Sequence, residues 1–140
     1  MKNLKNFLMQ SQLKVENVKY VASERILDDD KNPMEWEIRA ITNAEADVIK
    51  KECTRKNVSR NGAVSLDFDH EAFGEKVVAK STVYPELTNA ELQNGFGVMN
   101  EVDLLKKMLL FGEYSKYSQK VLEINGLGDT LKDKIEEAKN

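Results

Sequence analysis

Residues 23–53 read SERILDDDKNPMEWEIRAITNAEADVIKKEC, and this stretch decides the fold of the chain. Two runs that favour extended backbone, residues 18–27 and 34–41, flank a tip with the sequence DDDKNP at residues 28–33. Asp, Asn and Pro are among the residue types that most favour turns between strands. The stretch therefore predicts a β-hairpin.

The second run of this hairpin alternates between apolar and charged side chains. The apolar positions are Met34, Trp36, Ile38 and Ala40, and the charged ones between them are Glu35, Glu37 and Arg39. Because successive side chains of a strand point to opposite faces, the alternation predicts one buried and one solvated face. We therefore expect Trp36 on the buried face of the central strand.

A helix is predicted directly after the hairpin. Thr42 and Glu45 have the spacing of a capping box, in which each side chain satisfies a backbone donor at the start of a helix. We expect this helix to run to about Lys56. Residues 57–62 then predict a turn, and residues 63–68 predict a third short strand.

The remainder of the chain predicts helices. Asp69 is a suitable cap for a helix that reaches roughly Thr82, and Thr88 and Asn100 are each followed three residues later by an acidic residue. Gly112 is expected to separate two later helices. The chain is thus predicted to be α+β, a small antiparallel sheet with a mainly helical C-terminal half, in a single domain over residues 1–140.

The N-terminal segment has a shorter pattern. Leu4, Phe7 and Leu8 stand at i, i+3 and i+4, the spacing of a short amphipathic helix. A terminal helix of this kind usually docks on its own core, and a minority dock on a partner. We expect core docking here.

Composition limits the class of partner. The chain carries a net charge of −3, so it has no general electrostatic attraction to nucleic acid or to an anionic membrane. A single cysteine excludes an internal disulfide and is compatible with a reducing compartment. The sequence has neither a signal peptide nor an apolar run of bilayer-spanning length. Protein partners are therefore expected, with neither nucleic acid nor a membrane.

The chain resembles a known family along nearly its whole length. Besides residues 23–53, the stretches that carry the resemblance are LKNFLMQ at residues 4–10, VYPELTNAELQNGFGV at 83–98 and LLKKMLLFGEYSKYSQKVLEING at 104–126. In this order they are similar to the XkdN-like tail assembly chaperones of phages and of defective Bacillus prophages.

The resemblance implies a non-enzymatic protein. It would bind the phage tape measure protein, with other tail proteins as further candidates, and keep the tape measure protein soluble for tail tube assembly. It implies no cofactor, no metal and no catalytic residue. The expected location is the cytoplasm of the bacterial host rather than the mature virion, and homo-oligomerisation is compatible with this role.

One region fits a partner-binding surface. Between residues 95 and 117 the apolar and aromatic side chains outnumber what one amphipathic stripe can bury. Adaptable Met and aromatic surfaces suit a protein that covers long apolar helices. The predicted contact residues are Phe96, Met99, Met108, Phe111, Tyr114 and Tyr117. The alternative for each of them is a place in the core.

Several groups of side chains have the residue types of metal-binding or catalytic sites. Asp28, Asp30 and Asn32 match the first ligands of an EF-hand loop, but Pro33 and Arg39 stand where that loop needs Gly and Glu. Acidic residues next to His70 are explained by helix capping, and Cys53 is expected to be an ordinary small apolar residue. The acidic residues beside His70 are Asp67, Asp69 and Glu71. The cations around Cys53 form, with Arg60, the most basic local patch, which is a phosphate-contact surface or, as we expect, a solvated helix face: Lys50, Lys51, Arg55 and Lys56.

The main alternative function is DNA binding. Residues 121–138, VLEINGLGDTLKDKIEEA, resemble a helix-hairpin-helix element, in which backbone amides at a helix start hold a phosphate. This segment has five acidic residues against two lysines, a balance that repels DNA. A helix-hairpin-helix DNA-binding accessory protein therefore remains the second hypothesis.

Overall fold

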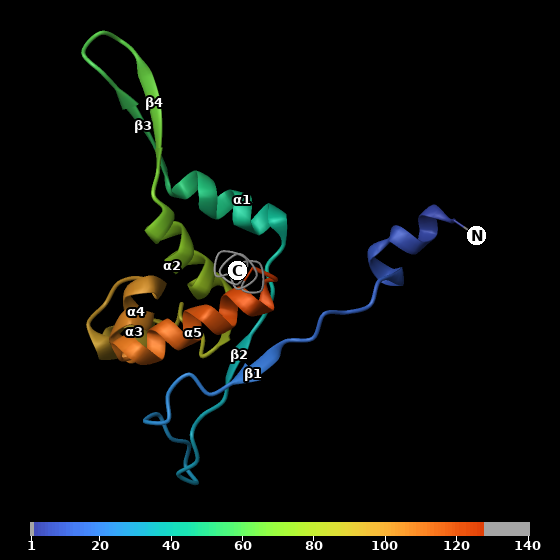
Figure 1. Ribbon diagram of the computed structural model, residues 1–140. Helices are drawn as coiled ribbons and strands as arrows, with labels where there is room; N and C mark the ends of the chain where they lie inside the picture. Colours follow the sequence, from blue (N-terminus) through green and yellow to red (C-terminus); the bar gives the residue numbers. More distant parts are fainter. Residues whose placement is uncertain (1, 128–140) are drawn as a thin grey trace, which may run out of the picture.

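The computed structural model describes residues 2–127 of the chain (Figure 1). Its central sheet has three antiparallel strands in the order β1 (Val18–Tyr20), β2 (Trp36–Ile38) and β5 (Thr82–Tyr84). The pairing of β1 with β2 confirms the predicted hairpin, although both strands are shorter than expected. The Asp28 carboxylate accepts hydrogen bonds from the backbone N–H groups of Asp30 and Asn32, each at 2.9 Å, and so forms the turn at the tip.

The predicted third strand exists but belongs to a second sheet. Residues Val64–Phe68 form β4, which pairs with β3 (Thr54–Val58) in a separate antiparallel ribbon. The expectation that this strand joins the first hairpin is therefore wrong, and β5 takes its place. The helix expected to reach Lys56 also ends early, because residues after Cys53 pair with β4 instead of continuing the helix.

The caps predicted for the two central helices are confirmed. The first, α1 (Asn43–Glu52), begins with a complete capping box of Thr42 and Glu45. The second, α2 (His70–Ser81), is capped by the Asp69 side chain, which accepts a hydrogen bond from the Ala72 backbone N–H. The ribbon of β3 and β4 joins these two helices and projects away from the rest of the molecule (Figure 1).

The described part of the C-terminal half is mainly helical, as predicted, and the last helix expected around Leu131 and Ile135 lies outside the described residues. The described part contains α3 (Ala90–Phe96), α4 (Glu101–Met108) and α5 (Phe111–Ile124). Asn100 caps α4 as expected, but α3 is capped by Asn89 rather than by Thr88. The break before α5 lies at Leu109 and Leu110, and not at Gly112, because the Glu113 carboxylate accepts a hydrogen bond from the Leu110 N–H and starts the helix there.

The main core lies between the three-stranded sheet and the helices α2, α4 and α5. Trp36 and Ile38 of β2 are buried in it, which confirms the face predicted from the alternation. A smaller core cluster of Ile49, Cys53 and Val77 lies between α1 and α2. The architecture is α+β, as predicted. No helix within residues 2–127 is both long and apolar enough to cross a membrane.

The N-terminal segment does not dock on the core. Two short 3-10 helices, η1 (Leu4–Phe7) and η2 (Met9–Ser11), lead into an extended stretch before β1. This arm, residues 2–17, points away from the body of the protein (Figure 1). The Leu4 and Phe7 side chains are 84% and 74% exposed, so the prediction of core docking is wrong. The spacing of three apolar residues indicated a helix face but could not indicate what covers it.

Candidate partner-binding surface

An apolar groove opens beside the central sheet, between the long β1–β2 connection and α3. Its volume is about 590 Å³. The apolar side chains around it come from the β1–β2 connection, from β2 and β5, and from α3 and α4: Ile26, Met34, Trp36, Tyr84, Pro85, Leu92, Phe96 and Met108. Trp36 is almost completely buried and belongs to the floor, whereas Tyr84 and Phe96 are exposed and form parts of the rim.

Hydrogen bonds hold both walls of this groove in place. On one side, the Glu113 carboxylate accepts hydrogen bonds from the Ser23 hydroxyl at 2.6 Å and from the Arg25 guanidinium at 2.7 Å. On the other side, the Gln93 side chain donates to the Leu87 carbonyl at 2.7 Å. The first set fixes the β1–β2 connection to α5, and the second fixes the segment before α3 to α3 itself.

The charge at the groove is entirely negative. Among the described residues, Glu86 and Glu91 are the only charged ones that line it. Both are exposed, and neither forms an ion pair within residues 2–127. The groove therefore combines an apolar interior with two carboxylates that have no cationic partner in the described part of the chain.

The structure separates the six predicted contact residues into four groups. Phe96 and Met108 line the groove, Phe96 as an exposed side chain and Met108 as a buried one. Met99 and Phe111 lie outside the groove, and both are 93% exposed. Tyr114 is half-buried against the main core.

Tyr117 is the sixth of these residues, and it is fully buried in the main core. Its hydroxyl lies 2.6 Å from the Thr82 hydroxyl, and burial raises the pKa of Tyr117 to about 12. A side chain with no exposed surface cannot contact a partner of the folded protein. Tyr117, and Met108 with its small exposed fraction, are therefore core residues that support the surface rather than form it.

Sequence reasoning did not identify four residues of the groove: Ile26, Met34, Tyr84 and Leu92. They lie on three segments far apart in the chain, and each segment shows only one or two of them. Met34 was expected on the buried face of its strand, and it lies half-buried just before β2. No local spacing indicates a groove whose walls are brought together only by the packing of the sheet against α3.

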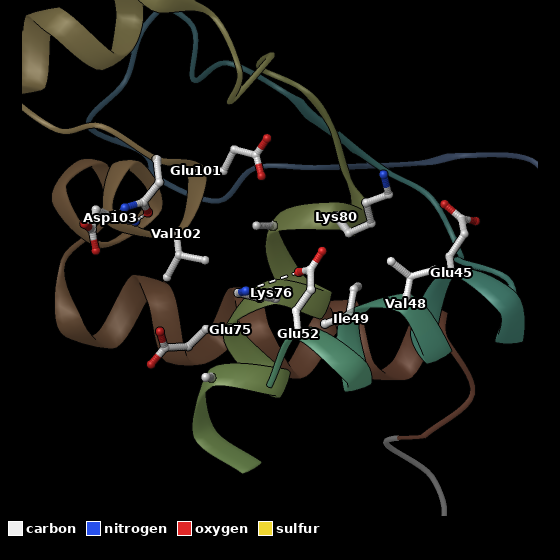
Figure 2. Close-up of a pocket in the computed structure, with 13 residues that line it drawn as sticks. Glu45, Val48, Ile49, Glu52, Glu75, Lys76, Lys80, Glu101, Val102 and Asp103 are labelled. Carbon is white, nitrogen blue, oxygen red and sulfur yellow. Dashed lines mark hydrogen bonds and ion pairs between the residues drawn. The ribbon is translucent and has the colours of Figure 1, made fainter. Parts of the chain in front are cut away.

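A second groove, of about 650 Å³, lies between α1, α2 and the start of α4 (Figure 2). Its walls are mostly charged, and its carboxylates are largely engaged. Glu52 accepts a hydrogen bond from Lys76 at 3.2 Å, and Glu45 pairs with Arg39 at 2.5 Å. The hydrogen bonds from Arg39 and from the Thr42 backbone lower the pKa of Glu45 to about 2. A carboxylate whose pKa is this low is a weak base, and it is therefore unsuited to act as a general base at neutral pH.

The other residues considered as chemical sites have structural roles. Cys53 is buried between α1 and α2, and His70 lies edge-on to the Phe68 ring with centroids 4.5 Å apart. Asp67 is hydrogen-bonded to Asn57 across the β3–β4 ribbon. No group of three or more His, Cys, Asp or Glu side chains in the described part of the chain is arranged to hold a metal ion.

The segment considered as a DNA-binding element is described only in part. Its first helix is the end of α5, and Gly126 follows with the positive φ of 79° that favours glycine. The residues after 127, which include the second helix of the proposed element, lie outside the described residues.

Comparison with known proteins places the chain among tail assembly proteins. The family described as phage XkdN-like tail assembly chaperone protein matches residues 4–139. The phage-like element PBSX protein XkdN of Bacillus subtilis is 33% identical over 140 residues, which cover 99% of this chain and 94% of XkdN. The YqbN protein of the same organism is 34% identical over 138 residues, 96% of this chain and 92% of YqbN.

A solved structure agrees with these sequence relationships. The crystal structure of YqbN superposes with a TM-score of 0.76 at 26% identity, over 90% of this chain and 98% of YqbN. The family match spans well over half of the chain, and both relatives align along nearly their whole length. On these grounds the chain belongs to the family of XkdN-like phage tail assembly chaperones.

Proposed function

We propose that this protein binds the tape measure protein of its phage or prophage and keeps it soluble until the tail tube assembles. It would act in the cytoplasm of the bacterial host, by binding alone and without catalysing a reaction, and it would be absent from the mature virion. The observation that carries the proposal is the apolar groove between the β1–β2 connection and α3, in a member of a tail assembly chaperone family.

The groove is suited to one apolar face of a client helix. Apolar clefts with a few polar groups are typical binding sites, and an amphipathic helix docks by placing its apolar face into such a groove. Phe96 at the rim of the groove, and Met99 and Phe111 outside it, are exposed apolar side chains that a client can also contact. Met and aromatic side chains adapt to different apolar partners, which suits a client with a long sequence and no single docking register.

Co-expression with the tape measure protein from the same phage tests this proposal. The soluble fraction of the tape measure protein should rise when this chain is present, and the two proteins should co-purify. Phe96→Asp and Phe111→Asp should each reduce capture, because a carboxylate would have to be desolvated against the apolar client.

Leu66→Asp is the matched control, since Leu66 is an exposed apolar residue on the β3–β4 ribbon, far along the chain from both sites. All three variants must show the thermal unfolding midpoint of the wild type to within a few degrees. An equally soluble tape measure protein with and without this chain would overturn the proposal. If Phe96→Asp and Phe111→Asp both captured the tape measure protein at the wild-type level, the client would bind at a different surface.

A further inference from the structure

The N-terminal arm and the apolar groove are chemically complementary. Five large apolar side chains of the arm are more than two-thirds exposed: Leu4, Phe7, Met9, Leu13 and Val15. None of them belongs to either core cluster of the described residues. Exposed apolar side chains on one segment indicate a surface that is covered in the assembled state.

The charges of the two surfaces are also complementary. The arm carries Lys2, Lys5 and Lys14 and has no acidic residue before Glu16. None of these lysines forms an ion pair within residues 2–127, and the groove presents Glu86 and Glu91, which are equally unpaired there. Residues 2–15 of the arm are therefore an apolar segment whose charges are all positive, and they complement the groove, which is apolar and carries two negative charges.

The direction of the arm favours the groove of a different molecule. The arm enters the sheet at Val18, which pairs with Ile38, whereas the groove begins at Trp36, which pairs with Tyr20 at the other end of β1. The arm therefore leaves the sheet at the end opposite to its own groove and runs away from the body (Figure 1). The six residues 12–17 between η2 and β1 can span up to about 20 Å when extended, which is long enough to reach a neighbouring molecule.

We infer that two copies of this chain exchange their N-terminal arms, each arm lying in the apolar groove of the other copy. Leu4, Phe7 and Leu8 enter the groove, and Lys5 lies near Glu91 at its rim. The exchange is reciprocal, so it closes as a two-fold symmetric dimer and does not continue into a filament. If the groove also receives the tape measure protein, a point that rests on the proposed function, the arm covers the groove until the client displaces it.

Analytical ultracentrifugation of the full-length protein alone, across a wide concentration range, tests this inference. The wild type should show a concentration-dependent monomer–dimer equilibrium. Deletion of residues 2–13 and the Phe7→Ser substitution should each weaken the dimer at least about tenfold, since a central aromatic side chain supplies a large share of binding energy at an interface. Both changes should leave the unfolding midpoint of the monomer unchanged, because the arm contributes nothing to the core.

A charge exchange distinguishes swapped arms from arms that fold back on their own groove. Lys5→Glu and Glu91→Lys should each weaken the dimer about tenfold, because each substitution occurs twice in a symmetric dimer. An equimolar mixture of the two variants should form a heterodimer, since both of its contacts again join opposite charges. The double variant, with both substitutions in one chain, should dimerise like the wild type. Lys116→Glu on the exposed face of α5 is the charge-matched control and should have no effect.

Three results would overturn the inference. The first is a wild type that stays monomeric at every concentration. The second is a dimer that survives deletion of residues 2–13 unchanged, which would place the interface elsewhere. The third is a pair of charge variants that fail to form a heterodimer on mixing. Because no client is present in these measurements, their outcome is independent of whether the tape measure protein is captured.

Discussion

The indole ring of Trp36 lies edge-on against the phenol ring of Tyr117, with ring centroids 5.2 Å apart and ring planes at 68°. This contact joins the middle strand of the sheet to α5, the longest helix among residues 2–127. Both side chains are buried, and the Tyr117 hydroxyl lies within hydrogen-bond distance of the Thr82 hydroxyl in β5. The two aromatic residues therefore connect the strands and the helical half of the fold into one core.

Replacement of Trp36 tests how much this side chain contributes to the free energy of unfolding. Trp36→Ala should lower the free energy of unfolding by about 3 to 5 kcal/mol, because it leaves a cavity at the centre of the core. Urea denaturation at a fixed protein concentration measures the change. Leu66→Ala is the control: Leu66 is 70% exposed on the ribbon, so its loss should cost less than about 0.5 kcal/mol. Equal effects of the two substitutions would show that Trp36 does not organise the core.

Tyr117 offers a smaller and more specific change. Tyr117→Phe keeps the ring and removes the hydroxyl that lies 2.6 Å from Thr82, so it should cost about 1 kcal/mol. The Thr82 hydroxyl keeps its hydrogen bond to the Val78 carbonyl, which limits the loss. Chemical denaturation of the variant gives the value. Capture of the tape measure protein should be unchanged, and a loss of capture by a stable Tyr117→Phe protein would contradict the core assignment.

Local signals in the sequence predicted local structure well. The capping residues Thr42, Asp69 and Asn100 each begin a helix as expected, because a cap depends on residues only three positions apart. The alternation around Trp36 likewise identified the buried face. Pairing between distant strands was not predictable in the same way: β5 is only three residues long, and its place beside β2 depends on how α2 packs.

The candidate site was predicted less well than the fold. A high density of apolar residues between positions 95 and 117 indicated a region for a binding surface, but density does not show which way a side chain points. Phe111 is almost fully exposed and Tyr117 fully buried, although they stand six positions apart on one helix. The N-terminal arm was mispredicted for the same reason. Its apolar spacing predicted one amphipathic helix docked on the core, whereas the segment forms two short 3-10 helices with Leu8 extended between them, and its Leu4 and Phe7 side chains are exposed.

Acid should weaken the attachment of the β1–β2 connection to α5. Hydrogen bonds from Arg25, Ser23 and the Leu110 backbone lower the pKa of Glu113 to about 2, from an ordinary value of 4.5. A carboxyl group with a lowered pKa stabilises the folded state above its unfolded pKa, and this stabilisation is lost as the pH falls from about 4.5 towards 2.

Glu113→Gln removes the titrating group and should therefore flatten the dependence of stability on pH in that range. Urea denaturation between pH 5 and pH 2.5 measures both proteins, and Glu35→Gln, at an exposed residue with no ion pair within residues 2–127, provides a matched substitution. The wild type should lose more stability on acidification than Glu113→Gln does. If the plots of unfolding free energy against pH were parallel for the two proteins, folding would not lower the pKa of Glu113.

A binding role without catalysis predicts that the nucleophile and base candidates are dispensable. Cys53→Ser and His70→Gln should both retain capture of the tape measure protein and support tail assembly, because the first side chain packs in a small core and the second rests on Phe68. Complementation of a gene deletion, scored as assembled tails by electron microscopy, checks this. Failure of either folded variant to assemble tails would argue for a chemical step.

Salt dependence separates an apolar client contact from a phosphate contact. Capture of the tape measure protein should persist, with its affinity changed less than about tenfold, between 50 mM and 1 M NaCl, since apolar burial is not screened by ions. Binding to DNA through phosphates would weaken by orders of magnitude over the same range. One protein preparation should be titrated in parallel with a tape measure fragment and with duplex DNA, and the two affinities should be compared at each salt concentration.

The β3–β4 ribbon projects from the ends of α1 and α2, and its tip at residues 59–62 lies at the far end from the body of the protein (Figure 1). The entropy of closing a loop grows only slowly with its length, so residues can be gained or lost at this tip without disturbing either core cluster. Insertions and deletions accumulated during the divergence of this family should therefore concentrate at the tip, where the ribbon can lengthen or shorten in steps of paired residues. A peptide epitope inserted after Asn61 should be tolerated for the same reason, and would allow the protein to be followed during infection.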